Sequence, residues 1–482
     1  METSLFACAE VRQGRVKRAS KKEVVVKSFI RRLISGIVPS KSKHATAQIA
    51  QVKPLEVATD VHPTAEIAQD AWIGIGARRP VIANTGEVVG YEFCIPAGVI
   101  SRMSLSPDQR VKSAYVACAI ASACLVEKAD KIGLARIPAH FLDPDLQLQS
   151  CAGIWIGIEF QRDPSELELQ IDKVLQFAHK LRSAGAKVGW DANLIEMEKY
   201  KLDLMPDFVL LQQGEAPVSA LIAARSTWPE ALKELPTIAT DLRSEEDLEA
   251  ALQGSISYVC GAFTLSKVAS DKTGRQPIPP DVMRLMGLMN LLISDGEFST
   301  VVNDIKGDVG LTYRLLSMMK SANYANHQGV QNIEQAVLTL GRDELYRILS
   351  VMLLRFSGTR KVSTALEEIA LWRSRFLELL AIDRSEAMPG NYFTLGLVSM
   401  LGSILKQELA DVVQKIALPE PARQALLTAD GPWRAYLLIA MEVEGQKLGS
   451  ENSVAKYFGG AERVLALSDT AWEWAAEKSK RG

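Results

Sequence analysis

The sequence predicts two kinds of domain in series, an α/β barrel followed by an all-helical domain. Between about residues 72 and 268, short runs rich in β-branched and aromatic residues alternate with helix-length amphipathic segments. After about residue 275 the strand signals stop, and apolar residues recur at helical spacing to near the C-terminus. A chain of 482 residues is long for a single domain, which agrees with this division.

The barrel prediction depends on the number and order of the β-rich runs, which read VVGYEF, IGLARI, GIWIGIEF, AKVGWDA, DFVLLQ, PTIAT and ISYVCGAF. Helical segments lie between them, such as PSELELQIDKVLQFAHKLRSAG, with Pro164 and Ser165 as its start signal and Gly185 as its stop signal. Repeated β–α units predict parallel strands that are covered by helices. About seven strands in about 200 residues indicate a TIM-like (β/α)₈ barrel or a shortened version of one.

The helical domain is predicted over residues 275–482, after a polar linker at 267–280. Its first segment, DVMRLMGLMNLLI, places apolar residues on one helical face: Val282, Leu285, Met286, Met289, Leu292 and Ile293. We expect this methionine-rich stripe to be core packing and not a cofactor site. The next segment predicts two helices that are separated at Gly307 and Asp308.

Residues 1–70 are predicted to be a largely disordered basic arm and linker. Residues 1–53 hold 12 Lys and Arg against 3 Asp and Glu, whereas the whole chain has a net charge of −2. This balance implies no global attraction to nucleic acid, so we expect no nucleic-acid partner. Residues 21–38 have the pattern of a basic amphipathic helix. This segment either makes weak, reversible contact with an anionic membrane or acidic partner, or is a tail that is helical only in passing or docks on the chain's own acidic body.

The six cysteines are scattered and form no CxxC motif, so buried reduced thiols are expected rather than disulfides or a zinc site. No apolar run reaches the roughly 18 residues that a membrane helix requires, and the N-terminus lacks a signal-peptide pattern. These features predict a cytoplasmic location. None of the five histidines lies in a metal-binding cluster.

Two stretches of the sequence resemble known bacterial signalling domains. RRPVIANTGEVVGYEF resembles the opening of an EAL domain, the barrel phosphodiesterase of cyclic di-GMP signalling. IPPDVMRLMGLM, DVGLTYRLLSMMKSANY and NIEQAVLTLGRDEL resemble an HDOD domain, a helical relative of HD phosphohydrolases. The resemblance implies an α/β plus all-α protein, with an EAL-like barrel at 72–268 and an HDOD domain at 275–482.

The EAL resemblance implies a degenerate metal site. Two-metal hydrolysis requires several carboxylates and an amide, which the family places at strand ends. The resemblance assigns three candidate ligands, Glu92, Glu159 and Asp191. The family's other polar positions hold Pro138, Ala192, Leu210, Gln212, Thr240, Arg243 and Cys260, and Phe93 and Cys94 follow the glutamate. Glu92 is then a relic that pairs with a basic residue, or it belongs to an altered ligand pocket.

The HDOD resemblance implies a second site without its metal ligands. The His-Asp pair of HD hydrolases falls on Ser399 and Met400 in GLVSMLG (396–402), and neither residue replaces an imidazole or a carboxylate. We therefore expect no catalytic residue, no metal and no cofactor. The expected function is a non-catalytic signal-transduction scaffold that binds an unidentified signalling protein. The alternatives are a receptor that binds cyclic di-GMP without hydrolysis and, third, an active phosphodiesterase.

Overall fold

The computed structural model of the chain describes residues 78–479, with gaps at 96, 105–108, 128–130, 147–150, 161–163, 192–204, 215, 255, 263–276, 295–296, 320–332, 357–362 and 446–452. The predicted arm at 1–70, its helix at 21–38, most of the linker at 267–280 and position 192 lie outside the described residues.

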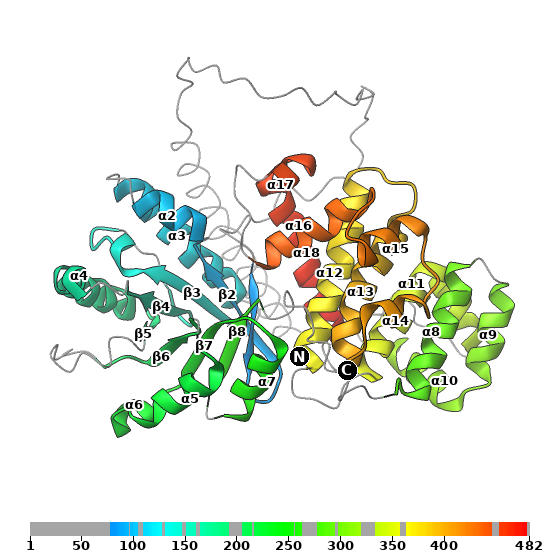
Figure 1. Cartoon of the computed structure of the whole chain (residues 1–482), viewed down its shortest axis with the longest axis horizontal. Coiled ribbons are helices and arrows are strands. Elements are labelled where there is room, and N and C mark those ends of the chain that lie inside the picture. Colours follow the sequence, from blue (N-terminus) through cyan, green and yellow to red (C-terminus); the bar gives the residue numbers. More distant parts are fainter. Residues whose placement is uncertain are drawn as a thin grey trace, which may run out of the picture. The chain divides into compact units, whose positions relative to one another are not determined.

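Eight strands form a closed barrel in sequence order, which confirms the predicted barrel (Figure 1). The strands are β1 Arg79–Ala83, β2 Val88–Cys94, β3 Ile132–Pro138, β4 Trp155–Glu159, β5 Lys187–Asp191, β6 Phe208–Gln212, β7 Thr237–Leu242 and β8 Tyr258–Gly261. All neighbours from β2 to β8 are parallel.

The seven predicted strands are β2 to β8, and β1, which was not among those runs, pairs antiparallel with both β2 and β8. The reason is a tight turn between β1 and β2. The amide of Gly86 donates to the carbonyl of Ala83 at 2.8 Å, and Gly86 has a φ of 89°, which favours glycine. Such a short connection joins antiparallel strands only, because a parallel pair requires a longer crossover.

Helices cover the barrel between its strands (Figure 1). They are α2 Ala97–Ser104, α3 Gln109–Glu127, α4 Pro164–Ser183, α5 Val218–Ser226, α6 Glu230–Lys233 and α7 Glu245–Gln253, with a short 3₁₀ turn at Ala139–Phe141. Helix α4 ends before Gly185, which has a φ of 92°, as the sequence predicts. Helix α7 is capped by Ser244, whose side chain accepts a hydrogen bond from the amide of Asp247.

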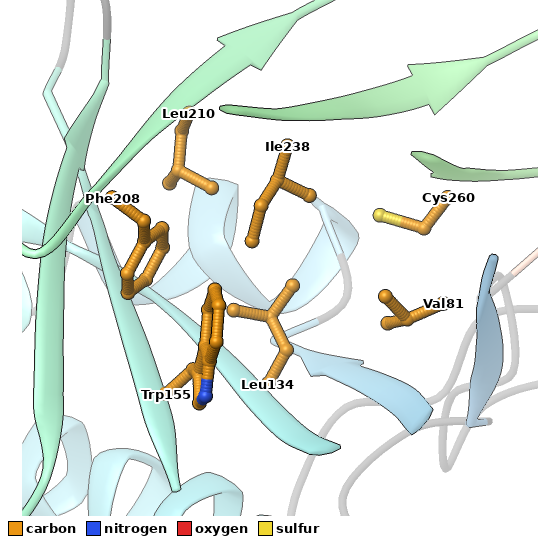
Figure 2. Packing of buried hydrophobic residues seen from close by; sticks show 7 residues of the cluster. All are labelled: Val81, Leu134, Trp155, Phe208, Leu210, Ile238 and Cys260. Carbon is orange, nitrogen blue, oxygen red and sulfur yellow. The ribbon is translucent and has the colours of Figure 1, made fainter. Parts of the chain in front are cut away.

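An apolar layer fills part of the barrel interior (Figure 2). It consists of Val81, Leu134, Trp155, Phe208, Leu210, Ile238 and Cys260. The rings of Trp155 and Phe208 lie 4.9 Å apart. Gly157 leaves room for Leu210, because a Cβ at Gly157 would lie 2.6 Å from a Leu210 methyl group. Each large side chain in this layer contributes about 1.5–3 kcal/mol through burial.

The second half of the described chain is all-helical, as predicted. Its helices are α8 Pro280–Ile293, α9 Phe298–Lys306, α10 Val309–Met319, α11 Ile333–Phe356, α12 Ser363–Asp383, α13 Pro389–Leu405, α14 Leu409–Val413, α15 Glu420–Leu427, α16 Arg434–Glu444, α17 Ser453–Tyr457 and α18 Ala461–Ser479. Helix α8 buries Met286 and Met289, which confirms the methionine stripe as core. Helices α9 and α10 separate at Gly307, as predicted.

Two features of the helical half were not predicted. Helix α11 is interrupted at Gly341, whose φ of 72° and ψ of 176° are not helical. The core between α12 and α18 is aromatic, because Trp372 stacks on Trp472 with 4.9 Å between ring centroids. In the part of the chain that the structure describes, no helix is long and apolar enough to cross a membrane.

Candidate functional site

The candidate site lies at the carboxyl ends of the parallel barrel strands, the end at which barrel enzymes place their chemistry. Side chains on alternate positions of a strand share one face. Strand β3 therefore directs Arg136 to the same side as Leu134 of the apolar layer, one step closer to the strand end. Strand β4 does the same with Glu159, which follows Trp155 and Gly157. A charged layer thus lies above the apolar one.

Arg136 is the centre of this charged layer, and its side chain is 3% exposed. Its Nη1 donates to Glu92 Oε1 at 2.7 Å, its Nε to Glu159 Oε1 at 2.7 Å and its Nη2 to Asp241 Oδ2 at 2.7 Å. A guanidinium offers its donors in a fixed planar fork, which suits three carboxylates that approach from different strands. One buried cation therefore joins β2, β4 and β7.

Arg79, the first residue of β1, is a second buried cation in the same layer. Its Nη1 lies 3.1 Å from Asp241 Oδ1 and 3.6 Å from Glu92 Oε2. We refer to Arg79, Glu92, Arg136, Glu159 and Asp241 as the Arg136 cluster. It combines three carboxylates with two guanidiniums, so most of the buried charge is compensated.

Asp241 reaches the cluster because of an irregularity in β7. The pairing of β7 with β8 shifts between Ala239 and Leu242, and Asp241 has a φ of 60°. Aspartate tolerates this left-handed backbone conformation better than most residues. Regular alternation would direct only Thr240 inward, whereas the shift adds Asp241 to the cluster.

The charges in the cluster reinforce one another. Burial alone would lower the pKa of Arg136, but the carboxylates of Asp241, Glu159 and Glu92 raise it well above its usual value. Burial alone would raise the pKa of Asp241, but Arg136 and Arg79 hold it well below its usual range. Arg136 and Asp241 are therefore both charged at neutral pH.

The structure brings together two of the three predicted ligand positions, Glu92 and Glu159, through Arg136. Asp191 is the last residue of β5, where its Cα lies beside that of Leu210. Glu92 is fully buried and pairs with basic residues, in agreement with the first of its two predicted roles.

Other positions at which the EAL family has a polar residue hold residues with different contacts in this protein. Leu210 and Cys260 belong to the apolar layer (Figure 2). The Cys260 thiol also donates to Glu92 Oε1 at 3.3 Å, and burial and Glu92 raise its pKa well above the usual value. Gln212 donates from Nε2 to Asp241 Oδ2 at 2.9 Å.

Sequence reasoning missed Arg79, Arg136 and Asp241. The sequence did contain a signal for Arg136. A charged side chain within an apolar strand is unusual, and Arg136 in IGLARIP is such a residue, as is Glu92 in VVGYEF. Asp241 had no such signal, since strand alternation assigned its neighbour to the interior.

In the helical half, the predicted positions Ser399 and Met400 lie on α13. Ser399 accepts a hydrogen bond from Arg373 Nη1 at 3.1 Å, and Arg373 forms a buried ion pair with Glu444. Met400 is buried in the core. A core methionine and a serine hydroxyl that is bonded to a buried arginine are both weak ligands for a hard metal ion.

Comparison with protein families identifies part of this half. The HDOD domain family matches residues 277–428. The chain contains an HDOD domain. Helices α16 to α18 follow the matched region, and they pack on the HDOD domain through contacts of α12 with α16 and α18.

Two curated proteins are similar to part of this chain. An uncharacterized protein of Bacillus subtilis, YuxH, is 30% identical over 35% of this chain and 44% of its own length. The cyclic di-GMP phosphodiesterase CdgJ of Vibrio cholerae is 22% identical over 40% of this chain and 45% of its own length. This chain therefore spans less than half the length of either curated relative.

The solved structures that resemble this chain include the Xanthomonas citri FimX EAL domain in complex with c-diGMP. It is 14% identical, with a TM-score of 0.29, over 40% of this chain and 86% of its own.

The HDOD domain and its following helices contact the barrel at β1 and β2. The Tyr91 hydroxyl donates to the Glu368 carboxylate of α12, and the Tyr91 ring meets Trp472 of α18 edge to face at 5.3 Å. Arg78 pairs with Asp469 of α18 at 2.8 Å. Burial raises the pKa of Glu368, and it raises that of Asp469 to about 6 despite the nearby Arg78.

The Arg136 cluster does not fit the two-metal centre that the EAL resemblance implies. Each of its three carboxylates is bonded to the guanidinium of Arg136, so a divalent cation would have to displace a nearly fully buried arginine. Across the described residues, no group of three or more His, Cys, Asp or Glu side chains is arranged to hold a metal ion.

Proposed function

We propose that this protein is a non-catalytic regulatory component of cyclic di-GMP signalling, which acts as a scaffold or adaptor through protein–protein contacts. The observation that carries this proposal is the position of Arg136. Its guanidinium bonds to Glu92, Glu159 and Asp241, the carboxylates that would otherwise be available to metal ions.

Two further observations support a regulatory function. In the HDOD domain, the resemblance assigns Ser399 and Met400 to the positions of the metal-binding pair, and Ser399 is bonded to Arg373. Among the similar proteins, CdgJ is described as a cyclic di-GMP phosphodiesterase and the FimX EAL domain is bound to c-diGMP. These descriptions favour the same signalling system as the setting in which this chain acts.

An assay for hydrolysis is the first test. The full chain is incubated with cyclic di-GMP and Mg²⁺ or Mn²⁺, and linear products are measured by chromatography. We expect no turnover with either metal, because removal of even one electrostatic contributor can cost 10²–10³-fold in rate. Metal-dependent turnover that is lost in Glu92→Ala would contradict the proposal and favour an active phosphodiesterase.

A binding titration separates the remaining alternatives. If the protein is a scaffold only, calorimetry with cyclic di-GMP, with and without Mg²⁺ or Mn²⁺, should show no binding. Binding without turnover would instead identify a receptor. For binding at the barrel mouth, Glu159→Gln should weaken the affinity, whereas Asp207→Asn should not. Asp207 pairs with Arg182 beside the amino-terminal end of β6, away from the Arg136 cluster.

A further inference from the structure

Arg79 belongs to the barrel, yet two of its hydrogen bonds go to the helical half. Its Nε donates to the carbonyl of Glu444 at 3.3 Å, and its Nη2 donates to the carbonyl of Gly445 at 3.4 Å. The same guanidinium donates to Asp241 of the Arg136 cluster at 3.1 Å. One side chain, 9% exposed, therefore bonds to both regions at once.

The carbonyls that Arg79 contacts lie at the C-terminal end of α16. The last carbonyls of a helix have no partner within the helix and carry partial negative charge, so a guanidinium is favourable there. Helix α16 is also held through the Glu444 side chain, which forms the buried ion pair with Arg373, and Arg373 bonds to Ser399. A continuous series of polar contacts thus runs from the barrel cluster to Ser399.

We propose that Arg79 couples the two regions, so that the charge state of the Arg136 cluster determines how firmly the end of α16 is held. The guanidinium is planar, so the bond to Asp241 fixes the direction of the donors that face α16. A ligand that takes over the Asp241 carboxylate would free Arg79 to turn and would loosen the last turn of α16. This inference stands whether or not the barrel binds a nucleotide.

Coupling of this kind is reciprocal, because the free energy that links two sites acts in both directions. A change on the helical side that displaces the end of α16 would alter the environment of Asp241. This coupling would allow a protein without catalytic activity to transmit a structural change from one domain to the other.

The test is hydrogen exchange on the full chain, read at the amides of residues 442–445. Asp241→Asn is expected to accelerate exchange there by roughly 5-fold or more, the lower end of typical coupling between sites. Asp241 has no hydrogen bond to α16 among the described contacts, so a purely local effect would leave these amides unchanged. The matched control is Asp207→Asn, which removes a barrel carboxylate outside the cluster.

A second variant distinguishes the proposed coupling from a general loss of stability. Arg79→Lys keeps a positive charge beside Asp241 but lacks the planar fork, and it should accelerate exchange at 442–445 while the amides of β3 and β4 stay protected. The proposal is overturned by unchanged exchange at 442–445 in Asp241→Asn, by an equal effect of Asp207→Asn, or by a uniform increase over the whole chain in both variants.

Discussion

Two aspartates of this protein lie beside arginines, with side chains that are 28% and 15% exposed for Asp241 and Asp469, and their pKa values move in opposite directions. Asp241, in the Arg136 cluster, contacts Arg136, Arg79 and Gln212, and its pKa is held well below the usual range. Asp469, at the contact between barrel and helical half, has Arg78 as its cation, and burial raises its pKa to about 6. Asp241 has more hydrogen-bond donors and is the less buried of the two, and both differences favour its charged form.

The largest loss of stability is expected when Arg136, the cation that the three carboxylates share, is replaced. Arg136→Met leaves three carboxylates around one remaining arginine, and we expect it to lower the free energy of unfolding by about 3–5 kcal/mol. Urea denaturation at pH 7 measures this loss. The control is Arg182→Met, which breaks a more exposed pair with Asp207 and should cost about 0–1 kcal/mol. Equal losses in the two variants would show that the cluster is no more than a surface network.

Asp241→Asn should have the next largest effect, and it should depend on pH. The folded pKa of Asp241 is below its unfolded value, so ionised Asp241 stabilises the fold above about pH 4, and this contribution is lost as pH falls toward the folded pKa. We expect the variant to be less stable than the wild type by about 1–3 kcal/mol at pH 7. The difference should shrink in urea series below pH 4, and a difference that is constant with pH would contradict the assignment.

Asp469→Asn should show a smaller effect with the opposite slope. The folded pKa of about 6 exceeds the unfolded value, so the folded protein binds more protons between about pH 4 and 6. Wild-type stability relative to the variant should therefore fall as pH rises through this window and level off above it. The same denaturation series measures the slope, and a flat or rising difference would remove the contrast with Asp241.

The smallest effect is expected for an exposed carboxylate, which serves as the baseline. Glu230 pairs with Lys233 three residues away on α6, and its side chain is 83% exposed. Glu230→Gln should change the free energy of unfolding by less than about 0.5 kcal/mol, with little dependence on pH. A loss as large as that of Asp241→Asn would mean that burial and donor number do not explain the comparison.

The fold was predictable because its signals are local and repeated. Seven β-rich runs with helical segments between them indicate a barrel, and the apolar face of α8 follows from helical spacing. The direction of β1 depends on the tight turn at Gly86, which the pattern of runs did not take into account. The interruption of α11 at Gly341 was missed in the same way, because a single glycine does not reveal its backbone angles.

The site was predictable only in part. Glu92 and Glu159 were assigned by the EAL resemblance, and Glu92 also stood out as a carboxylate within an apolar strand. Their partner Arg136 lies 44 residues after Glu92, and its contacts arise from the closure of the barrel, which no local pattern encodes. Asp241 joins the cluster through a backbone irregularity in β7, which reverses the side-chain direction that alternation predicts.

The reversed direction of β1 also determines where this protein can be shortened. In a barrel whose first strand is parallel to the others, the first residues of that strand lie at the end away from the site, and trimming them removes only structural contacts. Here the first residues of β1 are at the site end, and Arg79 is bonded to Asp241, Glu444 and Gly445. A truncated chain that starts at Pro80 would keep nearly all of the strand and lose the only side chain described as bonding to both the Arg136 cluster and α16.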